Sequence, residues 1–274
     1  MGYYLTVDQK GTKIYVEDIG SGMPILFLHG WPVNHKMFEY QFNELPKHGI
    51  RCIAIDLRGF GKSSRPFKGY TYNSLADDVR AVIHALQLSA LTLVGFSMGG
   101  AIALRYMSRH LGFGVNKLIL AGAAVPNFIK RDDFPYGLSK GEVDSIIQAT
   151  YQDRPAMLAD FGQKFFNSKI SSSFRDWFQL LGLEASGHGT IKTAKSLRDE
   201  DLREDLSQIF VKAYILHGKK DQICPFPLAE AMHKGIEGST LIPFEKSGHG
   251  LFYDEQKKFT ETLKDIVYSA AKRG

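Results

Sequence analysis

The segment 95–99, Gly-Phe-Ser-Met-Gly, constrains the fold of this chain more than any other. It follows a short apolar run, 90–94, that is typical of a buried strand, and it precedes residues 101–110, which have a helical pattern. Ser97 is therefore predicted on a sharp turn between a strand and a helix. The flanking glycines fit such a turn, because glycine has no Cβ to collide with closely packed backbone.

A serine raised on such a turn is a candidate nucleophile, provided that a histidine takes its proton and an acid orients the histidine. Asp221 lies just beyond the strand-like run 214–218, at the place where open α/β sheets bind ligands. His249 lies between two glycines, after the strand-like run 240–244. Either residue alone is more typical of a surface loop. Together, in the chain order Ser-Asp-His, they are predicted to be catalytic.

Attack on a carbonyl also requires backbone N–H groups for the developing negative oxygen, and the loss of one such donor typically costs about 3 to 4 kcal/mol. Met98 is one candidate, because it follows the serine and begins a helix whose N-terminus favours an anion. The second is Trp31, in the loop after the apolar run 25–28. Pro32, the next residue, has no N–H to donate.

The other histidines are given no direct role. His29 and His217 each end a strand-like run and precede a glycine, so we expect them to hydrogen-bond locally beneath the site. Surface positions are expected for those in polar or helical surroundings, which is where histidine is commonly exposed. These are His35, His48, His84, His110, His188 and His233.

The chain resembles the α/β-hydrolase superfamily and, within it, the cofactor-free bacterial haloperoxidases (perhydrolases), aryl esterases and γ-lactamases. The motifs are His-Gly-Trp-Pro at 29–32, Asp-Leu-Arg-Gly-Phe-Gly-Lys-Ser-Ser at 56–64, the serine turn 95–100, His-Gly-Lys-Lys-Asp-Gln-Ile-Cys-Pro at 217–225 and Gly-His-Gly at 248–250. The resemblance implies that Ser97, Asp221 and His249 form a catalytic triad and that Trp31 and Met98 form the oxyanion hole. It also implies that neither a cofactor nor a metal is used.

The alternation of strand-like and helical segments predicts an α/β-hydrolase fold, a mostly parallel eight-stranded sheet with helices on both faces and an inserted helical cap. A chain of 274 residues with 44% apolar residues is long enough for one such core. Strand-like runs are missing from residues 126–205, which are predicted to form the cap over Ser97. Residues 1–125 and 206–274 are then the core.

An apolar substrate pocket is predicted between cap and core, and it would favour small esters or lactones. Cys224, at a position where relatives often carry valine, is included as a small apolar side chain, although a purely structural thiol is the more common role. The cap aromatics could equally form a small core of their own. The candidate pocket residues are Phe128, Phe161, Phe165, Ile223, Cys224 and Leu251.

Charge and cysteine content bear on partners and location. The net charge of +5 is spread along the chain without a long basic run, which argues against a nucleic-acid or membrane partner. Cys52 and Cys224 are far apart and suit a reducing cytosol. The N-terminus shows no secretory signal, so a cytoplasmic location is expected. The sequence leaves open whether the protein forms a homo-oligomer.

The predicted function is that of a serine hydrolase that cleaves small carboxylic esters or lactones through an acyl-enzyme, with perhydrolase or haloperoxidase chemistry as a side activity. Carbon–carbon bond hydrolases and enol-lactone hydrolases also carry Ser-Met-Gly-Gly and stay open as alternatives, with Lys130 or Arg131 as candidates for binding an acidic substrate. A ligand receptor without turnover is a further alternative, which an intact triad disfavours. Serine at the turn argues against dehalogenases and epoxide hydrolases, because both need aspartate there.

Overall fold

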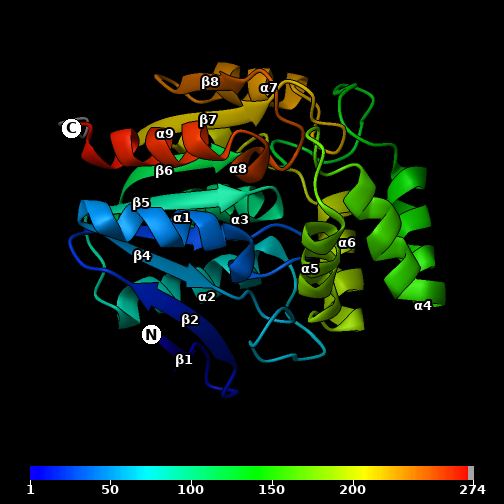
Figure 1. The fold of residues 1–274 in the computed structure, drawn as a ribbon, viewed down its shortest axis with the longest axis horizontal. Coiled ribbons are helices and arrows are strands. Elements are labelled where there is room, and N and C mark those ends of the chain that lie inside the picture. The colour runs from blue at the N-terminus through cyan, green and yellow to red at the C-terminus, as the bar shows by residue number, and fades with distance from the viewer. Residues whose placement is uncertain (271–274) are drawn as a thin grey trace.

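The computed structural model describes residues 1–270, and its centre is a twisted eight-stranded sheet (Figure 1). The strands lie in the order β1-β2-β4-β3-β5-β6-β7-β8. The pairs β1/β2 and β2/β4 are antiparallel, and all the other pairs are parallel. The strands are β1 (Gly2–Thr6), β2 (Lys13–Ile19), β3 (Met23–Leu28), β4 (Ile50–Ile55), β5 (Leu91–Phe96), β6 (Val115–Ala121), β7 (Lys212–Gly218) and β8 (Thr240–Phe244).

Burial along the strands explains why this sheet is covered on both faces. Each residue of β5 is buried, and β4 is buried except at Arg51. Continuous apolar runs of this kind are typical of parallel strands packed between two helical layers. At the edge of the sheet, β1 alternates between exposed and half-buried residues, since one side of this strand faces solvent.

Helices cover both faces of the sheet. In Figure 1, α1 and α9 lie in front of it, whereas α2 and α3 lie behind it. The helices of the core are α1 (Glu39–Glu44), α2 (Tyr72–Ala85), α3 (Met98–Arg109), α7 (Pro227–Gly235), α8 (Leu251–Asp254) and α9 (Gln256–Tyr268). Short 3-10 turns are η1 (His35–Phe38), η2 (Leu45–His48) and η3 (Leu206–Gln208).

Between β6 and β7 the chain forms three further helices, which we call the cap helices: α4 (Lys140–Gln163), α5 (Ser172–Leu183) and α6 (Gly187–Asp199). The residue directly before each of these helices is a serine whose side chain accepts a hydrogen bond from a backbone N–H of the first turn. A non-helical residue, Asp153, and the following Pro155 kink α4. In Figure 1 the arrows of the parallel strands β4, β5 and β7 point toward the cap helices, so these helices lie at the carboxyl ends of the parallel strands.

The predicted fold class is confirmed, and each of the eight predicted strands is present near its expected position. The helix after Ser97 begins at Met98, earlier than residue 101, because the glycines at 99 and 100 continue the helix directly from the turn. Across residues 1–270, every helix falls short of the length or the apolarity that crossing a bilayer requires.

Candidate active site

Ser97 occupies a strained turn between β5 and α3. Its backbone has φ 53° and ψ −118°, a conformation that costs a non-glycine residue on the order of 1 to 3 kcal/mol. The turn is held by close backbone packing. A Cβ on Gly95 would lie 2.4 Å from the Gly99 carbonyl oxygen, and one on Gly99 would lie 2.3 Å from the Leu28 carbonyl oxygen. Glycine at both positions is therefore what allows the turn to form.

Three residues from distant parts of the chain form one hydrogen-bonded series. The Nδ1–H of His249 donates to Asp221 Oδ2 at 2.7 Å, which leaves Nε2 free to accept from the Ser97 hydroxyl at 2.9 Å. His249 is 0% exposed and Ser97 only 4% exposed. In such a series the imidazole can take the serine proton, while the carboxylate orients the ring and stabilises its charged form.

The loop after β7 supports the Asp221 carboxylate. The amides of Ile223 and Cys224 each donate to Asp221 Oδ1 at 2.8 Å, so one oxygen is bound to the backbone and the other to His249. Hydrogen bonds to an ionised carboxylate are about twice as strong as neutral ones. The loop therefore holds the carboxylate in place and aimed at the imidazole.

His217 lies beneath the site, as expected. Its Nε2–H donates to the Cys224 carbonyl at 2.7 Å and is 3.5 Å from Asp221 Oδ2. Burial lowers the pKa of His217, so the ring stays neutral beside the carboxylate. Burial also raises the pKa of the Cys224 thiol well above its ordinary value, and the Asp221 charge adds to this. Neither side chain competes with His249 as the base.

Backbone N–H groups are available beside Ser97. Met98 is the first residue of α3, where an amide has no partner inside the helix. The second candidate is Trp31, whose loop approaches the serine so closely that a Cβ on Gly30 would lie 3.0 Å from the Ser97 Cβ. Within residues 1–270 neither amide donates a backbone hydrogen bond. The Trp31 indole N–H donates to the Thr190 carbonyl at 2.9 Å, which ties this loop to α6.

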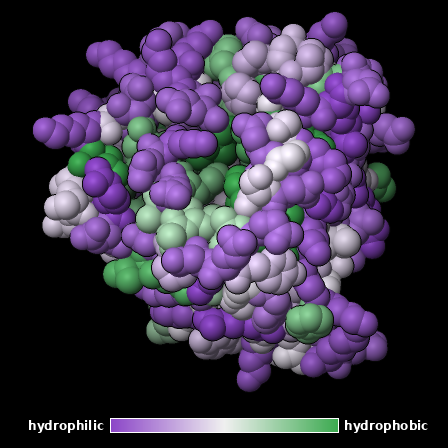
Figure 2. Space-filling model, turned by 90° about the vertical axis from the view of Figure 1, so that its right-hand side faces the viewer, coloured by the Kyte–Doolittle hydropathy of each residue, from purple (hydrophilic) through white to green (hydrophobic). Residues whose placement is uncertain are grey.

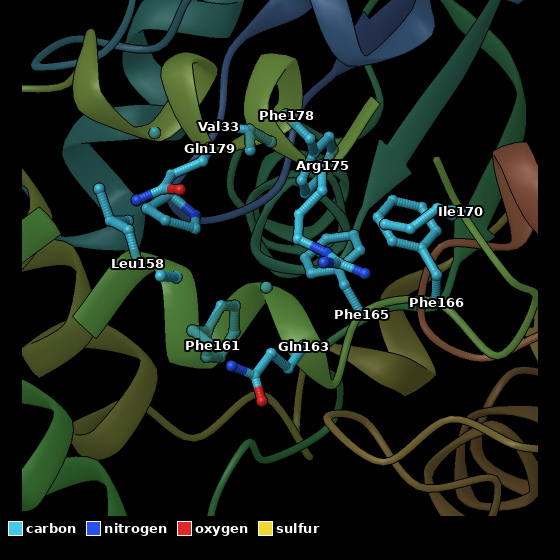
Figure 3. Close-up of a pocket in the computed structure, with 14 residues that line it drawn as sticks. Val33, Leu158, Phe161, Gln163, Phe165, Phe166, Ile170, Arg175, Phe178 and Gln179 are labelled. Carbon is cyan, nitrogen blue, oxygen red and sulfur yellow. The ribbon is translucent and has the colours of Figure 1, made fainter. Parts of the chain in front are cut away.

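A pocket of about 80 Å³ lies between α4, α5 and the loop after Trp31 (Figure 3). Most of its wall is aromatic or aliphatic. Phe165 connects the pocket to the triad, because its ring centroid lies 4.8 Å from that of His249. The pocket is lined by Pro32, Val33, Leu158, Ala159, Phe161, Gly162, Gln163, Phe165, Phe166, Ile170, Arg175, Phe178, Gln179 and Gly182.

Of the six predicted pocket residues, Phe161 and Phe165 line this pocket. The other four do not, for reasons that depend on packing. Ile223 and Cys224 lie under Asp221, where their amides bind the carboxylate. Leu251 is fully buried at the start of α8, and Phe128 is buried in the hydrophobic core.

Comparison with known proteins agrees with this geometry. The model of the α/β-hydrolase fold family matches residues 23–256. The chain belongs to this family. It is 55% identical over 263 residues to the AB hydrolase superfamily protein YisY of Bacillus subtilis (strain 168), covering 96% of this chain and 98% of that one. The predicted resemblance is thereby confirmed.

Two solved structures extend the comparison for this α/β hydrolase. The esterase EaEST from Exiguobacterium antarcticum shares 55% sequence identity and a TM-score of 0.96, covering 98% of this chain and 100% of that one. A bromoperoxidase from Bacillus anthracis shares 33% identity and a TM-score of 0.94 with the same coverage. The backbone that carries Ser97, Asp221 and His249 is thus shared with enzymes of both kinds.

The structure corrects the placement of His35 in this α/β hydrolase. Instead of lying at the surface, His35 is 8% exposed, and both its ring and its backbone N–H donate to Asp56 Oδ1. Burial disfavours the charge of Asp56, but the hydrogen bonds and charge of His35 outweigh it and lower the pKa of Asp56. Asp56 also accepts from the Lys62 amide, so this pair holds the loop 56–62 in place. A local polar context could not reveal a partner 21 residues away.

The two basic residues that were predicted to bind an acidic substrate, Lys130 and Arg131, do not line the pocket. Arg131 donates to Asn127 Oδ1 at 3.1 Å and lies 3.7 Å from Asp201, outside the pocket lining. Lys130 is exposed and likewise absent from the lining. The basic residue that does line the pocket is Arg175 of α5, which the sequence pattern did not single out.

Proposed function

We propose that this α/β hydrolase is a serine esterase that cleaves small carboxylic esters or lactones through an acyl-enzyme. The observation that carries the proposal is the hydrogen-bonded series from Ser97 through His249 to Asp221, beside an apolar pocket. The 55% identity to a protein described as an esterase supports the same substrate class.

In the first step, the Ser97 hydroxyl attacks the ester carbonyl carbon while His249 Nε2 takes the hydroxyl proton. The imidazolium that forms is stabilised by the Asp221 carboxylate, which accepts from Nδ1 at 2.7 Å. The carbonyl oxygen becomes an oxyanion, and the amides of Met98 and Trp31 are proposed to bind it. His249 then gives the proton to the leaving alkoxide, so the alcohol departs and the acyl group stays on Ser97.

In the second step, water takes the place of the departed alcohol and attacks the acyl-enzyme. His249 takes a proton from the water as its oxygen attacks the acyl carbon. The carbon–Oγ bond then breaks, and the proton returns to Ser97. The products are the carboxylic acid and the free enzyme. Each step uses the same base and the same oxyanion donors, so no further group is required for hydrolysis.

The segment 126–205 is proposed to act as a cap that shapes this site. It contributes α4 and α5 to the pocket, and α6 binds the Trp31 indole through the Thr190 carbonyl. Phe161 packs edge-on against the Trp31 ring with centroids 4.9 Å apart. The pocket of about 80 Å³ that Phe161 helps to line suits a small acyl group. We therefore expect short-chain esters to be the best substrates.

Perhydrolysis is proposed as a side activity, supported by the 33% identity to a bromoperoxidase along nearly the whole chain. Hydrogen peroxide would replace water in the second step, attack the acyl carbon and release a peracid, with the proton returning to Ser97 through His249. The peracid would then oxidise a halide ion to hypohalous acid and become the carboxylate. Bromination of a phenol dye that depends on acetate, peroxide and bromide, and disappears in Ser97→Ala, would support this activity.

The proposal includes a small-molecule substrate, without a nucleic-acid or membrane partner, and a cytoplasmic location. Support for the location comes from Cys52 and Cys224, both of which are unpaired and buried. Unpaired thiols are typical of a reducing compartment.

The test is hydrolysis of nitrophenyl esters of increasing acyl length by wild-type protein and Ser97→Ala at neutral pH. We expect turnover that is fastest with short acyl chains and falls by at least about 1,000-fold in the variant. The melting temperature of Ser97→Ala serves as the folding control. Activity of the variant within tenfold of wild type would contradict the mechanism. Slow hydrolysis that does not respond to the substitution would favour a carbon–carbon bond hydrolase or a receptor.

A further inference from the structure

Arg175 is the one charged residue among the fourteen that line the pocket. Arg175 is the fourth residue of α5, which begins at Ser172, and its side chain is exposed. Figure 3 shows its side chain extending from α5 across the space enclosed by the labelled residues. The remaining lining consists of apolar side chains, two glycines and the amides of Gln163 and Gln179. A substrate in this pocket therefore meets a single positive charge.

The guanidinium of Arg175 has no ion pair within residues 1–270. Asp176 is the adjacent residue, but neighbours along a helix project in different directions, and Asp176 is not part of the lining. Other arginines of the cap are engaged. Arg198 pairs with Asp144 and Asp199, and Arg154 donates to the Gly182 carbonyl. Arg175 thus keeps its donors available to a ligand.

The pocket connects this charge with the reacting groups. Phe165, which is 0% exposed, faces the pocket on one side and packs against His249 on the other. Pro32 belongs to the lining and directly follows Trp31, the proposed oxyanion donor. One end of the apolar space therefore adjoins the proposed site of acyl transfer, and Arg175 stands at the solvent-exposed part of the wall.

The surface formed by the cap helices has the features expected of an entrance to this pocket. Figure 2 shows the side of the molecule formed by the cap helices, with an apolar area hollowed near its centre and hydrophilic residues around it. A hydrocarbon chain can enter such a hollow, whereas a carboxylate at its end requires a cation to offset the loss of water. The planar guanidinium can bind a carboxylate through two parallel N–H···O bonds.

We propose that Arg175 is a specificity-determining residue that selects esters or lactones carrying a free carboxylate at the end remote from the reacting carbonyl. The carboxylate binds the guanidinium, the methylene chain contacts the phenylalanine walls, and the ester carbonyl reaches Ser97. This inference rests on the proposed esterase function and names its substrate class. The substrates best matched to the pocket are then half-esters of dicarboxylic acids.

The experiment compares two series of nitrophenyl esters of matched chain length. One is made from simple fatty acids and the other from dicarboxylic acids, so that only the second series carries a remote carboxylate. The variants are Arg175→Gln, Arg175→Lys and the matched control Lys164→Gln. Lys164 is an exposed lysine that follows α4 and is absent from the pocket lining, so its loss changes the cap charge equally.

We expect Arg175→Gln to lower kcat/KM for the dicarboxylic series by about tenfold, mostly through KM, because a partly exposed charged hydrogen bond is lost. Its kcat/KM for the neutral series falls much less than for the dicarboxylic series, and an unchanged melting temperature shows that the variant is folded. Arg175→Lys keeps part of the preference, Lys164→Gln keeps all of it, and added salt weakens it in the wild type. An unchanged ratio in Arg175→Gln, or an equal loss in Lys164→Gln, would overturn the proposal.

A binding measurement separates this inference from the esterase function. In the Ser97→Ala background, calorimetric titration with monoethyl glutarate measures binding without turnover, and ethyl butyrate serves as the neutral control ligand. Tighter binding of the half-ester that is lost in Ser97→Ala/Arg175→Gln supports the role of Arg175 even if hydrolysis proves slow. Equal binding of both ligands, unaffected by the second substitution, would overturn it. Absence of hydrolysis in both ester series would count against the proposed function alone.

Discussion

The ring of Phe165 packs 4.8 Å from the imidazole of His249, centroid to centroid, with the two planes at 75°. Phe165 also lies 5.9 Å from Phe96, which immediately precedes Ser97. One side chain from the segment after α4 thus covers both the base and the strand that carries the nucleophile. Because Ser97 is only 4% exposed, the space available to an acyl group depends on this ring.

Replacing Phe165 with leucine should enlarge the space next to His249. We expect the preferred acyl chain to lengthen by about two carbons, and the free energy of unfolding to fall by about 1 to 3 kcal/mol because a fully buried ring is lost. Rates with a series of nitrophenyl esters and urea denaturation measure the two effects. Leu180→Ala, which removes an exposed side chain of α5 outside the pocket lining, is the control for the chain-length profile. An unchanged chain-length profile in Phe165→Leu would show that this ring does not limit the acyl site.

Replacing Asp221 with asparagine should leave the fold intact but impair the base. The amide cannot hold the Nδ1–H tautomer of His249 or stabilise the imidazolium, so kcat should fall by about 1,000- to 10,000-fold. Steady-state hydrolysis of a short-chain ester provides the measurement. Lys220→Ala changes the adjacent exposed residue and should retain full activity. A loss smaller than tenfold in Asp221→Asn would mean that another group orients His249.

Adding a methyl group at Gly99 should disrupt the turn that carries Ser97. The new Cβ would lie 2.3 Å from the Leu28 carbonyl oxygen, on a backbone that has no room to move. We expect Gly99→Ala to lose about 2 to 4 kcal/mol of stability and most of its activity. Gly162→Ala is the matched control, because a Cβ there meets nothing within 4 Å and alanine favours a helix. Equal stability of the two variants by urea denaturation would contradict this account of the turn.

His29 should make the protein less stable as the pH falls. Burial lowers the pKa of His29 from 6.5 to about 4, while its Nδ1–H donates to the Gly30 carbonyl and Nε2 accepts from the Leu57 amide. Between these two pKa values the unfolded chain binds a proton that the native state does not. The stability contributed by the neutral ring is therefore complete above about pH 6.5 and is lost as the pH falls toward 4, by about 3 kcal/mol.

Urea denaturation of wild type and His29→Asn between pH 7 and pH 4 checks this prediction. The variant should be less stable than wild type at pH 7, but its free energy of unfolding should depend less on pH in this range. The exposed His84, replaced with glutamine, should leave the wild-type slope unchanged. Parallel curves for wild type and His29→Asn would indicate that His29 does not titrate with a depressed pKa.

Local patterns were sufficient to predict the sheet and the order of the reacting residues. Apolar runs predicted the buried strands of the sheet. The glycines around Ser97 indicated backbone packed too closely for a Cβ, and the structure shows that Gly99 lies against the Leu28 carbonyl oxygen. Asp221 and His249 could be predicted because each follows a strand that ends at the same edge of a parallel sheet. The chain direction of parallel strands brings such positions together without any detail of side-chain packing.

The lining of the pocket was decided by the tertiary structure alone. The amides of Ile223 and Cys224 bind the Asp221 carboxylate and neither residue lines the pocket, whereas Arg175 lines it from a helix with no distinctive motif. His35 likewise finds Asp56 only through folding. Sequence periodicity specifies which residues share the face of one strand or helix. It does not specify how two elements meet, because that depends on side-chain shapes and polar partners contributed by distant segments.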